Sequence, residues 1–386
     1  MKKKCKFVFF TGLCCILSFF LYSCAKSPVA SSDPASAVTV NGWEVVTGTK
    51  YDSGETVVNP DFSNTGNRIT PGLGYGIAGE FDVNFIDLNS AWTVGNLGDV
   101  LIIRNAISAS PAGKFVSCGS SGRLQSVFAL NSSRIWIAGR DTNAGRLGSS
   151  VFYSSDGGET WTVQGNTALT YTGRSITTND RFNMFCFITS GENINGWVAG
   201  GLGDNSPVIW KTSDGATWTE SFHSGTISGV LGGISFYDTS NGIAVGENGL
   251  ILVTANGGTT WAQKSSGVVT TLYKVKMTAA DTAFAAGANG VILKTTNGGS
   301  SWTAIDIGVS TWLYALEISG KNIWVGGDGG KIYFSGDSGS TWTTQDSHTN
   351  QPINSIRMFS GTYGWAACGA TAAYSGALLR TTTGGN

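Results

Sequence analysis

The chain has 386 residues, of which 55 are glycine and 13 are tryptophan; 13% of the residues are charged and the net charge is −1. Average proteins contain roughly 7% glycine and 25% charged residues, so glycine is about doubled here and charge about halved. An apolar fraction of 41% excludes intrinsic disorder. The lack of a basic excess argues against nucleic-acid binding, and the glycine content disfavours a helical protein.

The N-terminal segment has the pattern of an export signal. Four lysines within the first six residues precede the apolar run Phe7–Phe20, which is shorter than the roughly 20 residues of a membrane-spanning helix. The run ends in Leu21-Tyr-Ser-Cys24, which resembles the lipobox of bacterial lipoproteins. The alternative is an ordinary signal peptide with an incidental cysteine.

The lipobox resemblance implies a signal peptide over residues 1–23 and a lipid on Cys24, followed by a flexible tether over residues 24–40. We therefore expect the chain to be anchored to a membrane of the bacterial cell envelope, with the outer membrane favoured. The sequence leaves open whether the protein faces the periplasm or the cell exterior.

Residues 41–386 carry a repeat that predicts β-strands. An aromatic or aliphatic residue, two mostly small residues and then glycine, or cysteine in the last copy, recur along the chain, and a β-rich run follows each copy. The spacing near 40 residues is that of a four-stranded propeller blade, so seven copies predict seven blades. We expect these small residues on the crowded inner strands. The copies begin at Trp92, Trp136, Trp197, Ile243, Phe284, Ile323 and Trp365.

A second repeat has the pattern Ser/Thr-x-Asp/Asn-x-Gly-x-x-Trp, with one copy a residue shorter. Its acidic or amide side chain can accept hydrogen bonds from backbone N–H groups two residues on, and its glycines permit positive φ, so each copy predicts a tight turn between strands. Asparagine cannot transfer protons, so we interpret the repeat as structural. The five pairs are Asp156 and Trp161, Asp214 and Trp218, Asn256 and Trp261, Asn297 and Trp302, and Asp337 and Trp342.

The two ends of this region complement each other. Residues 380–386 are a sixth copy that stops before its tryptophan, and residues 41–46 supply a tryptophan, Trp43, and a strand. We predict that this N-terminal strand completes the seventh blade, which closes the ring and removes an open sheet edge.

The second repeat resembles the Asp-box, or BNR, repeat of bacterial sialidases and of the photosystem II assembly factor family. The repeat length, the blade count and the runs that begin at Lys211 and Lys294 are more similar to the latter, over roughly residues 81–386. The resemblance implies an all-β, seven-bladed β-propeller of four-stranded antiparallel blades. It also implies a non-catalytic scaffold for a membrane-protein partner, with the Asp boxes on the third-to-fourth strand turns, away from the binding face.

We expect a ligand on the opposite face, which is formed by the links between blades and the loops between second and third strands. The link after Trp161 is the longest, blade 2 has a long loop over residues 140–148, and six of the ten arginines fall between residues 123 and 181. We predict a rim that binds a carboxylate-bearing glycan or an acidic protein segment. The alternative is that these are solvated loop charges. The rim residues are Arg140, Arg146, Tyr171, Arg174 and Arg181.

Few residues are available for metal or cofactor chemistry. Besides Cys24, the mature chain keeps Cys118, Cys186 and Cys368 without a CxxC motif, and its two histidines, His223 and His348, fall in nearly opposite blades. We therefore expect no metal and no cofactor, and interpret the three thiols as small buried hydrophobic groups.

A sialidase-like glycoside hydrolase is the enzymatic alternative. That family has a Phe-Arg-Ile-Pro motif, whose nearest match here, residues 67–71, lacks the phenylalanine and has an inserted threonine. We therefore favour a monomeric, non-catalytic envelope lipoprotein whose propeller binds a protein partner or a glycan, and no nucleic acid. A cluster of glutamate, aspartate and tyrosine at the axial mouth would favour the enzyme, whereas a lining of serine, threonine, asparagine and backbone would favour binding.

Overall fold

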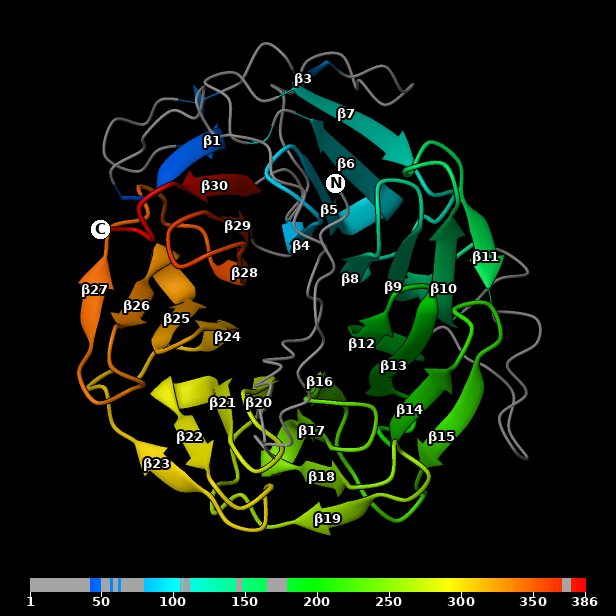
Figure 1. Cartoon of the computed structure of the whole chain (residues 1–386), viewed down its shortest axis with the longest axis vertical. Coiled ribbons are helices and arrows are strands. Elements are labelled where there is room, and N and C mark those ends of the chain that lie inside the picture. The colour runs from blue at the N-terminus through cyan, green and yellow to red at the C-terminus, as the bar shows by residue number, and fades with distance from the viewer. Residues whose placement is uncertain are drawn as a thin grey trace, which may run out of the picture.

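A computed structural model describes residues 42–49, 56–57, 62–63, 80–104, 106, 112–143, 148–164, 179–369 and 376–386. They form seven sheets arranged as blades around a central axis (Figure 1), which confirms the predicted propeller. The signal segment, Cys24 and the tether lie outside the described residues. No helix in the described part of the chain has the length and apolarity needed to span a membrane.

In each blade the chain runs outward from the axis through four antiparallel strands. Blade 1 contains β4 (Glu80–Phe85), β5 (Ser90–Gly95), β6 (Asp99–Arg104) and β7 (Ala112–Ser117). Blade 2 contains β8 (Leu124–Ala129), β9 (Ile135–Asp141), β10 (Gly148–Ser154) and β11 (Thr162–Gln164). Blade 3 contains β12 (Arg181–Ser190), β13 (Asn193–Gly201), β14 (Pro207–Thr212) and β15 (Thr219–His223). Blade 4 contains β16 (Leu231–Phe236), β17 (Gly242–Gly246), β18 (Ile251–Thr254) and β19 (Ala262–Lys264).

The remaining blades continue the same pattern. Blade 5 contains β20 (Leu272–Met277), β21 (Ala283–Gly287), β22 (Ile292–Thr295) and β23 (Thr303–Ile305). Blade 6 contains β24 (Leu313–Ser319), β25 (Asn322–Gly327), β26 (Ile332–Ser335) and β27 (Thr343–Gln345). Blade 7 contains β28 (Ile353–Met358), β29 (Gly364–Cys368), β30 (Ala377–Thr381) and β1 (Glu44–Thr49). Two short strands extend the outer edges, β2 (Thr56–Val57) beside β1 and β3 (Phe62–Ser63) beside β7.

Short 3-10 turns join the second and third strands of four blades. They are η1 (Asn96–Gly98), η2 (Glu247–Gly249), η3 (Ala288–Gly290) and η4 (Asp328–Gly330).

The hydrophobic core is divided among the blade interfaces. Each of the seven clusters of buried side chains in the described residues combines two neighbouring blades, and the cluster of blades 4 and 5, for example, contains Val245, Ala285 and Leu293. The small-residue repeat lies on the second strand of each blade, one of the inner strands, as expected; this strand is covered on both faces, and Ala138, Ala285 and Ala366 have no exposed surface.

The Asp boxes lie on the turns between third and fourth strands, as the resemblance implied. In the first box, the Ser154 hydroxyl donates to Asp156 Oδ1 at 2.8 Å and accepts from the Gly158 N–H at 2.8 Å. Asp156 Oδ1 in turn accepts from the Thr160 N–H at 2.9 Å, four residues on rather than two. In the shortened box, Asp214 accepts from residues two and three positions on.

The boxes also connect neighbouring blades. An indole on the second strand of one blade donates to a box glycine carbonyl of the next blade: Trp92 to Gly157 at 2.9 Å, Trp136 to Gly215 at 2.7 Å, Trp197 to Gly257 at 3.2 Å and Trp324 to Gly384 at 2.9 Å. In blades 4 and 5 the corresponding residues, Ile243 and Phe284, pack on the next box through apolar contacts instead. Each box therefore stabilises an interface as well as a turn.

The ring closes as predicted, with β1 antiparallel to β30; in Figure 1 the blue first strand lies beside the red last one. Trp43 is 1% exposed and donates through Nε1 to Gln345 Oε1 at 2.9 Å, so it takes the place of the missing box tryptophan. Arg380 joins three segments, because it pairs with Glu44 of β1 at 2.7 Å and donates to the Ala106 carbonyl of blade 1 at 3.3 Å.

Candidate functional site

One face of the ring is built from the blade-to-blade links and the turns between second and third strands, as predicted; we call it the link face. Backbone hydrogen bonds join the two kinds of segment, from Glu247 N to Val230 O at 3.1 Å, from Ala288 N to Thr271 O at 2.8 Å and from Asp328 N to Trp312 O at 3.0 Å. The Asp-box turns lie at the other end of the strands. The link face is thus the surface on which the variable loops gather.

A β-bulge near the start of each innermost strand places one extra residue at the link-face end of that strand. In β20, for example, Leu272 pairs with Gly287 and Lys274 pairs with Ala286, which leaves Tyr273 as the extra residue. Bulges redirect side chains and are common beside functional sites. This ring of positions is absent from the residues predicted from the sequence, although their shared distance from each strand start would have located them. The bulge residues are Phe81, Gln125, Asn183, Gly232, Tyr273, Tyr314 and Asn354.

Three arginines gather on the link face at blades 2 and 3; we call Arg123, Arg140 and Arg181 the arginine cluster. Partial burial, and then the like charges of Arg140 and Arg181, lower the pKa of Arg123, which remains charged at neutral pH. The guanidinium of Arg123 lies over the Phe81 ring, 5.5 Å from its centroid. Arg181 lies 3.7 Å from Glu247 of η2.

The arginine cluster contains two of the five predicted rim residues. Arg140 and Arg181 come together with Arg123, which the sequence analysis did not include in the rim. The other three predicted rim residues, Arg146, Tyr171 and Arg174, lie outside the described residues. Arg123 precedes Leu124, the first residue of β8, so its position at a strand start was the signal that could have added it.

Aromatic residues gather across the mouth, at blades 5 and 6; we call Tyr273, Trp312 and Tyr314 the aromatic cluster. Their ring centroids are 5.1 to 6.3 Å apart. Trp312 is 47% exposed, whereas most of the other large apolar side chains in the described residues are covered. Burial raises the pKa of Tyr314, and the negative charge of Asp328 raises it further.

Below the mouth, charged side chains join five blades across the innermost strands. Asp82 has no exposed surface, and its carboxylate accepts from Ser355 Oγ at 2.6 Å, Ser126 Oγ at 3.0 Å and the Val127 N–H at 3.1 Å. Arg357 lies 3.8 Å from Asp82 and 3.5 Å from Glu317.

The same network continues into blade 5. Lys276 lies 3.2 Å from Glu317. Burial lowers the pKa of Lys274, and the charge of Asp82 opposes this effect. We call Asp82, Lys274, Lys276, Glu317 and Arg357 the axial network.

The axial network does not provide a pair of catalytic carboxylates. A glycosidase needs two carboxyl groups that flank the scissile bond, one of which donates a proton. Asp82 is fully buried, and the Glu317 side chain is 7% exposed and held between Lys276 and Arg357. The residues around the axial mouth also differ from the serine, threonine and asparagine that we expected of a binding mouth, because they include lysine, arginine and tyrosine. In the described part of the chain these two acids serve the connection between blades.

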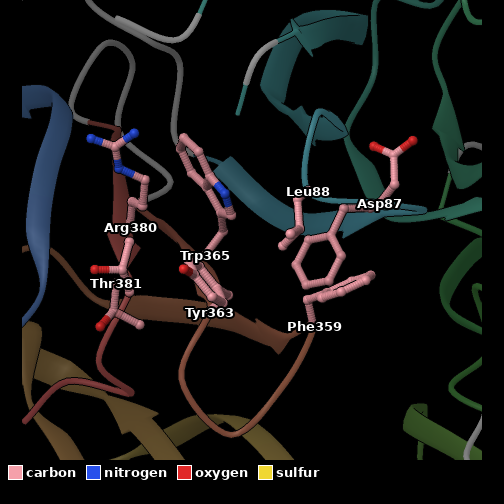
Figure 2. Close-up of a pocket in the computed structure, with 10 residues that line it drawn as sticks. Asp87, Leu88, Phe359, Tyr363, Trp365, Arg380 and Thr381 are labelled. Carbon is pink, nitrogen blue, oxygen red and sulfur yellow. The ribbon is translucent and has the colours of Figure 1, made fainter. Parts of the chain in front are cut away.

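The opposite, Asp-box face has a hollow between blades 7 and 1. Figure 2 shows Trp365, Tyr363 and Phe359 of blade 7 beside Leu88 of blade 1. Its volume is about 10 Å³, which is roughly the space of one water molecule. We therefore place the candidate site on the link face.

Within the described residues, no group of three or more histidine, cysteine or acidic side chains is arranged to hold a metal ion. Cys118, Cys186 and Cys368 are buried, as expected, and form no disulfide within the described residues. Burial raises the pKa of Cys118 to about 12 and also raises that of Cys368, so these two thiols are unreactive at neutral pH.

Comparison with known proteins supports the resemblance drawn from the repeats. Residues 223–313 match the family model described as the photosynthesis system II assembly factor YCF48. A structure of YCF48 bound to a D1 peptide superposes with a TM-score of 0.61 at 17% identity, over 92% of this chain and all of that one. YCF48 from Cyanidioschyzon merolae gives a TM-score of 0.58 at 17% identity, over 80% of this chain and 96% of that one.

An enzyme shares the same fold. The GH74 xyloglucanase from Xanthomonas campestris has a TM-score of 0.56 at 12% identity, and the match covers 76% of this chain and 52% of that one. At these identities a structural likeness shows the fold alone. A search of the curated proteins finds no match. The chain is a β-propeller with BNR-type repeats that resembles the photosystem II assembly factor YCF48.

Proposed function

We propose that this chain is a non-catalytic lipoprotein of the bacterial cell envelope whose link face binds an acidic segment of a partner protein. The arginine cluster carries the proposal, because three guanidinium groups at one side of the axial mouth offer charge-assisted hydrogen bonds to carboxylates. The partial exposure of these side chains leaves them accessible to a ligand. The YCF48 structure with a D1 peptide supports a peptide as the class of ligand.

Binding of a glutamate-rich ten-residue peptide to the purified full chain tests this function. We expect Arg123→Ala and Arg140→Ala each to weaken binding by about tenfold or more, since a hydrogen bond to a charged group contributes about 1.5–3 kcal/mol. The matched control is Arg134→Ala, which removes the same charge from an arginine that pairs with Glu192 at 2.9 Å, at the opposite end of β9 from Arg140. An equal loss in the control would contradict a specific site.

Salt provides a second readout, because ionic contacts at an exposed surface weaken as ionic strength rises. Affinity for the glutamate peptide should fall between 0.05 and 0.5 M salt (about 14 to 4 Å in Debye length), and the fall should be smaller in the Arg123→Ala variant. Release of reducing ends from a panel of acidic and neutral glycans would instead establish a glycosidase, the alternative function.

The lipid anchor is a separate part of the proposal and rests on the Leu21-Tyr-Ser-Cys24 motif. Replacement of Cys24 by serine should move the expressed chain from the membrane fraction to the soluble fraction and abolish labelling by a fatty-acid probe. Cys118→Ser is the matched control. An unchanged membrane fraction in Cys24→Ser would contradict the anchor without affecting the proposed binding site.

A further inference from the structure

We propose that the aromatic cluster is a second binding site on the link face, which receives an arginine or lysine side chain of the partner. This inference rests on the proposed function only in taking the partner to be a protein. It assigns a ligand to residues on the side of the mouth that the arginine cluster does not occupy. The site consists of Tyr273, Trp312 and Tyr314 with two carboxylates, Asp328 and Glu247.

The geometry of the rings favours a compact ligand over a flat one. Tyr273 and Tyr314 are tilted by 52°, Tyr273 and Trp312 by 38°, and Trp312 and Tyr314 meet edge to face at 79°. Rings at such angles form a corner rather than a continuous plane. A sugar ring stacks on a plane, whereas a guanidinium or ammonium group can contact two ring faces at a corner.

The charge around the rings favours a cation. Asp328 belongs to η4, directly beside the cluster, since its N–H donates to the Trp312 carbonyl at 3.0 Å. The turn η2, which contains Glu247, contacts β20, the strand of Tyr273. Burial raises the pKa of Tyr273, and the negative charges of Asp328 and Glu247 raise it further. Aromatic faces attract cations, and an adjacent carboxylate adds to that attraction.

The neighbouring blades leave the cluster open. At the bulge position of blade 4, next to Tyr273, the residue is Gly232, where the other six blades have a side chain. The other two residues of η4, Gly329 and Gly330, line a groove of about 360 Å³ together with Lys331 and Asp346. Open surface on blade 6 therefore lies beside the turn whose Asp328 N–H contacts Trp312.

Glu247 connects the two sites, because it pairs with Arg181 at 3.7 Å and also acts on Tyr273. The mouth thus carries positive charge over blades 2 and 3 and aromatic rings with negative charge over blades 5 and 6. A partner segment with one acidic end and one basic end can occupy both sites in only one chain direction, with its acidic end over blades 2 and 3. The second site therefore sets the orientation of the partner.

The test uses N-acetyl-arginine amide as the probe and measures changes in the indole N–H resonances of the full chain. We expect the Trp312 resonance to shift, and N-acetyl-citrulline amide, which lacks the charge, to bind at least about fivefold more weakly. Trp312→Ala should reduce affinity by a similar factor. Asp328→Asn, which keeps the size of the side chain, should weaken binding through the loss of charge alone. Val269→Ala, at another exposed apolar side chain, is the control and should bind normally.

The two sites can fail separately. Trp312→Ala should leave affinity for the glutamate peptide unchanged, and Arg123→Ala should leave affinity for the arginine probe unchanged or slightly raised. Equal binding of the arginine and citrulline probes, or no response at Trp312, would overturn the cation site. So would binding of a neutral oligosaccharide that is lost in Trp312→Ala, since the cluster would then be a sugar platform.

Discussion

A single side chain organises each Asp box, and a carboxylate is not required for that role. Asp156 accepts from the Thr160 N–H at 2.9 Å, and Asn256 accepts from the Thr260 N–H at the same distance. The two residues differ only at the second polar atom of the side chain. Asp156 Oδ2 accepts a hydrogen bond from the Thr160 hydroxyl, whereas Asn256 Nδ2 donates one to the Thr260 hydroxyl. A hydroxyl serves equally as acceptor and donor, so either residue satisfies the turn.

This equivalence predicts the outcome of two substitutions. Asp156→Asn should change the free energy of unfolding at pH 7 by less than about 0.5 kcal/mol, whereas Asp156→Ala should lower it by about 1–2 kcal/mol through the loss of the turn hydrogen bonds. Chemical denaturation monitored by tryptophan fluorescence measures both. A large loss in the asparagine variant would show that the charge itself contributes.

The box acids also predict a pH dependence. Hydrogen bonds lower the pKa of Asp156, Asp214 and Asp337 to about 2, chiefly from Thr160, the Thr217 N–H and Thr341 respectively. Because the folded pKa lies below the unfolded value of roughly 3.9, this stabilisation is present above about pH 4 and is lost as the pH falls towards 2.

Thermal unfolding across this pH range checks the expectation. The midpoint should fall between about pH 4 and pH 2, and the fall should be smaller when all three acids are replaced by asparagine, because Asn256 and Asn297 show that the turn then still forms. The same acid sensitivity in the triple variant would assign the effect to other carboxylates.

Strand β1 supplies both the outer edge of blade 7 and core residues, Val45 and Val46. It pairs with β30, and Trp43 beside it packs with Val45, Ala315 and Trp324. Glu44 adds an ion pair to Arg380, whose side chain is 3% exposed. The last blade is therefore complete only when both ends of the ring are present.

Deletion of residues 41–50 should destabilise the whole ring rather than one blade. The burial of Trp43 alone accounts for about 3–5 kcal/mol, and the loss of β1 exposes the edge of β30. Differential scanning calorimetry should show a lower midpoint and one broadened transition. Deletion of the ten residues before them, 31–40, is the matched control, and an unchanged midpoint in the 41–50 deletion would contradict the closure role of β1.

At the centre of the ring, the axial network connects five of the seven blades, 2, 1, 7, 6 and 5, through Asp82, Arg357 and Glu317. Buried ion pairs add little net stability, but removal of one partner leaves an uncompensated charge. The contacts at the axis join residues up to 273 positions apart in the chain. Their loss therefore affects the arrangement of blades around the mouth.

Asp82→Ala should lower the free energy of unfolding by about 3–5 kcal/mol, because Arg357 then loses a buried counter-charge. Asp306→Ala, which removes an exposed acid that accepts only a local N–H from Gly308 within the described residues, is the control and should cost less than about 1 kcal/mol. Denaturant titration compares the two, and equal costs would show that the axial network is not a special source of stability.

The sequence by itself determined the architecture of this protein. Asp-box turns and second-strand repeats are local signals, since the residues that form each turn lie within about four positions of one another, and the sevenfold recurrence of the second-strand repeat predicted the blade count. The unfinished box at residues 380–386 and the tryptophan at position 43 likewise predicted the closure, because each lacks what the other supplies.

Only the tertiary structure decided which side chains meet on the link face. Arg123, Arg140 and Arg181 belong to two blades, and Tyr273, Trp312 and Asp328 come from separate segments of blades 5 and 6. The bulges at the mouth arise from pairing between the first and second strands of each blade, so they form only once the strands have paired. A binding surface of this kind combines residues tens of positions apart, so its chemistry emerges only when the blades are packed around a common axis.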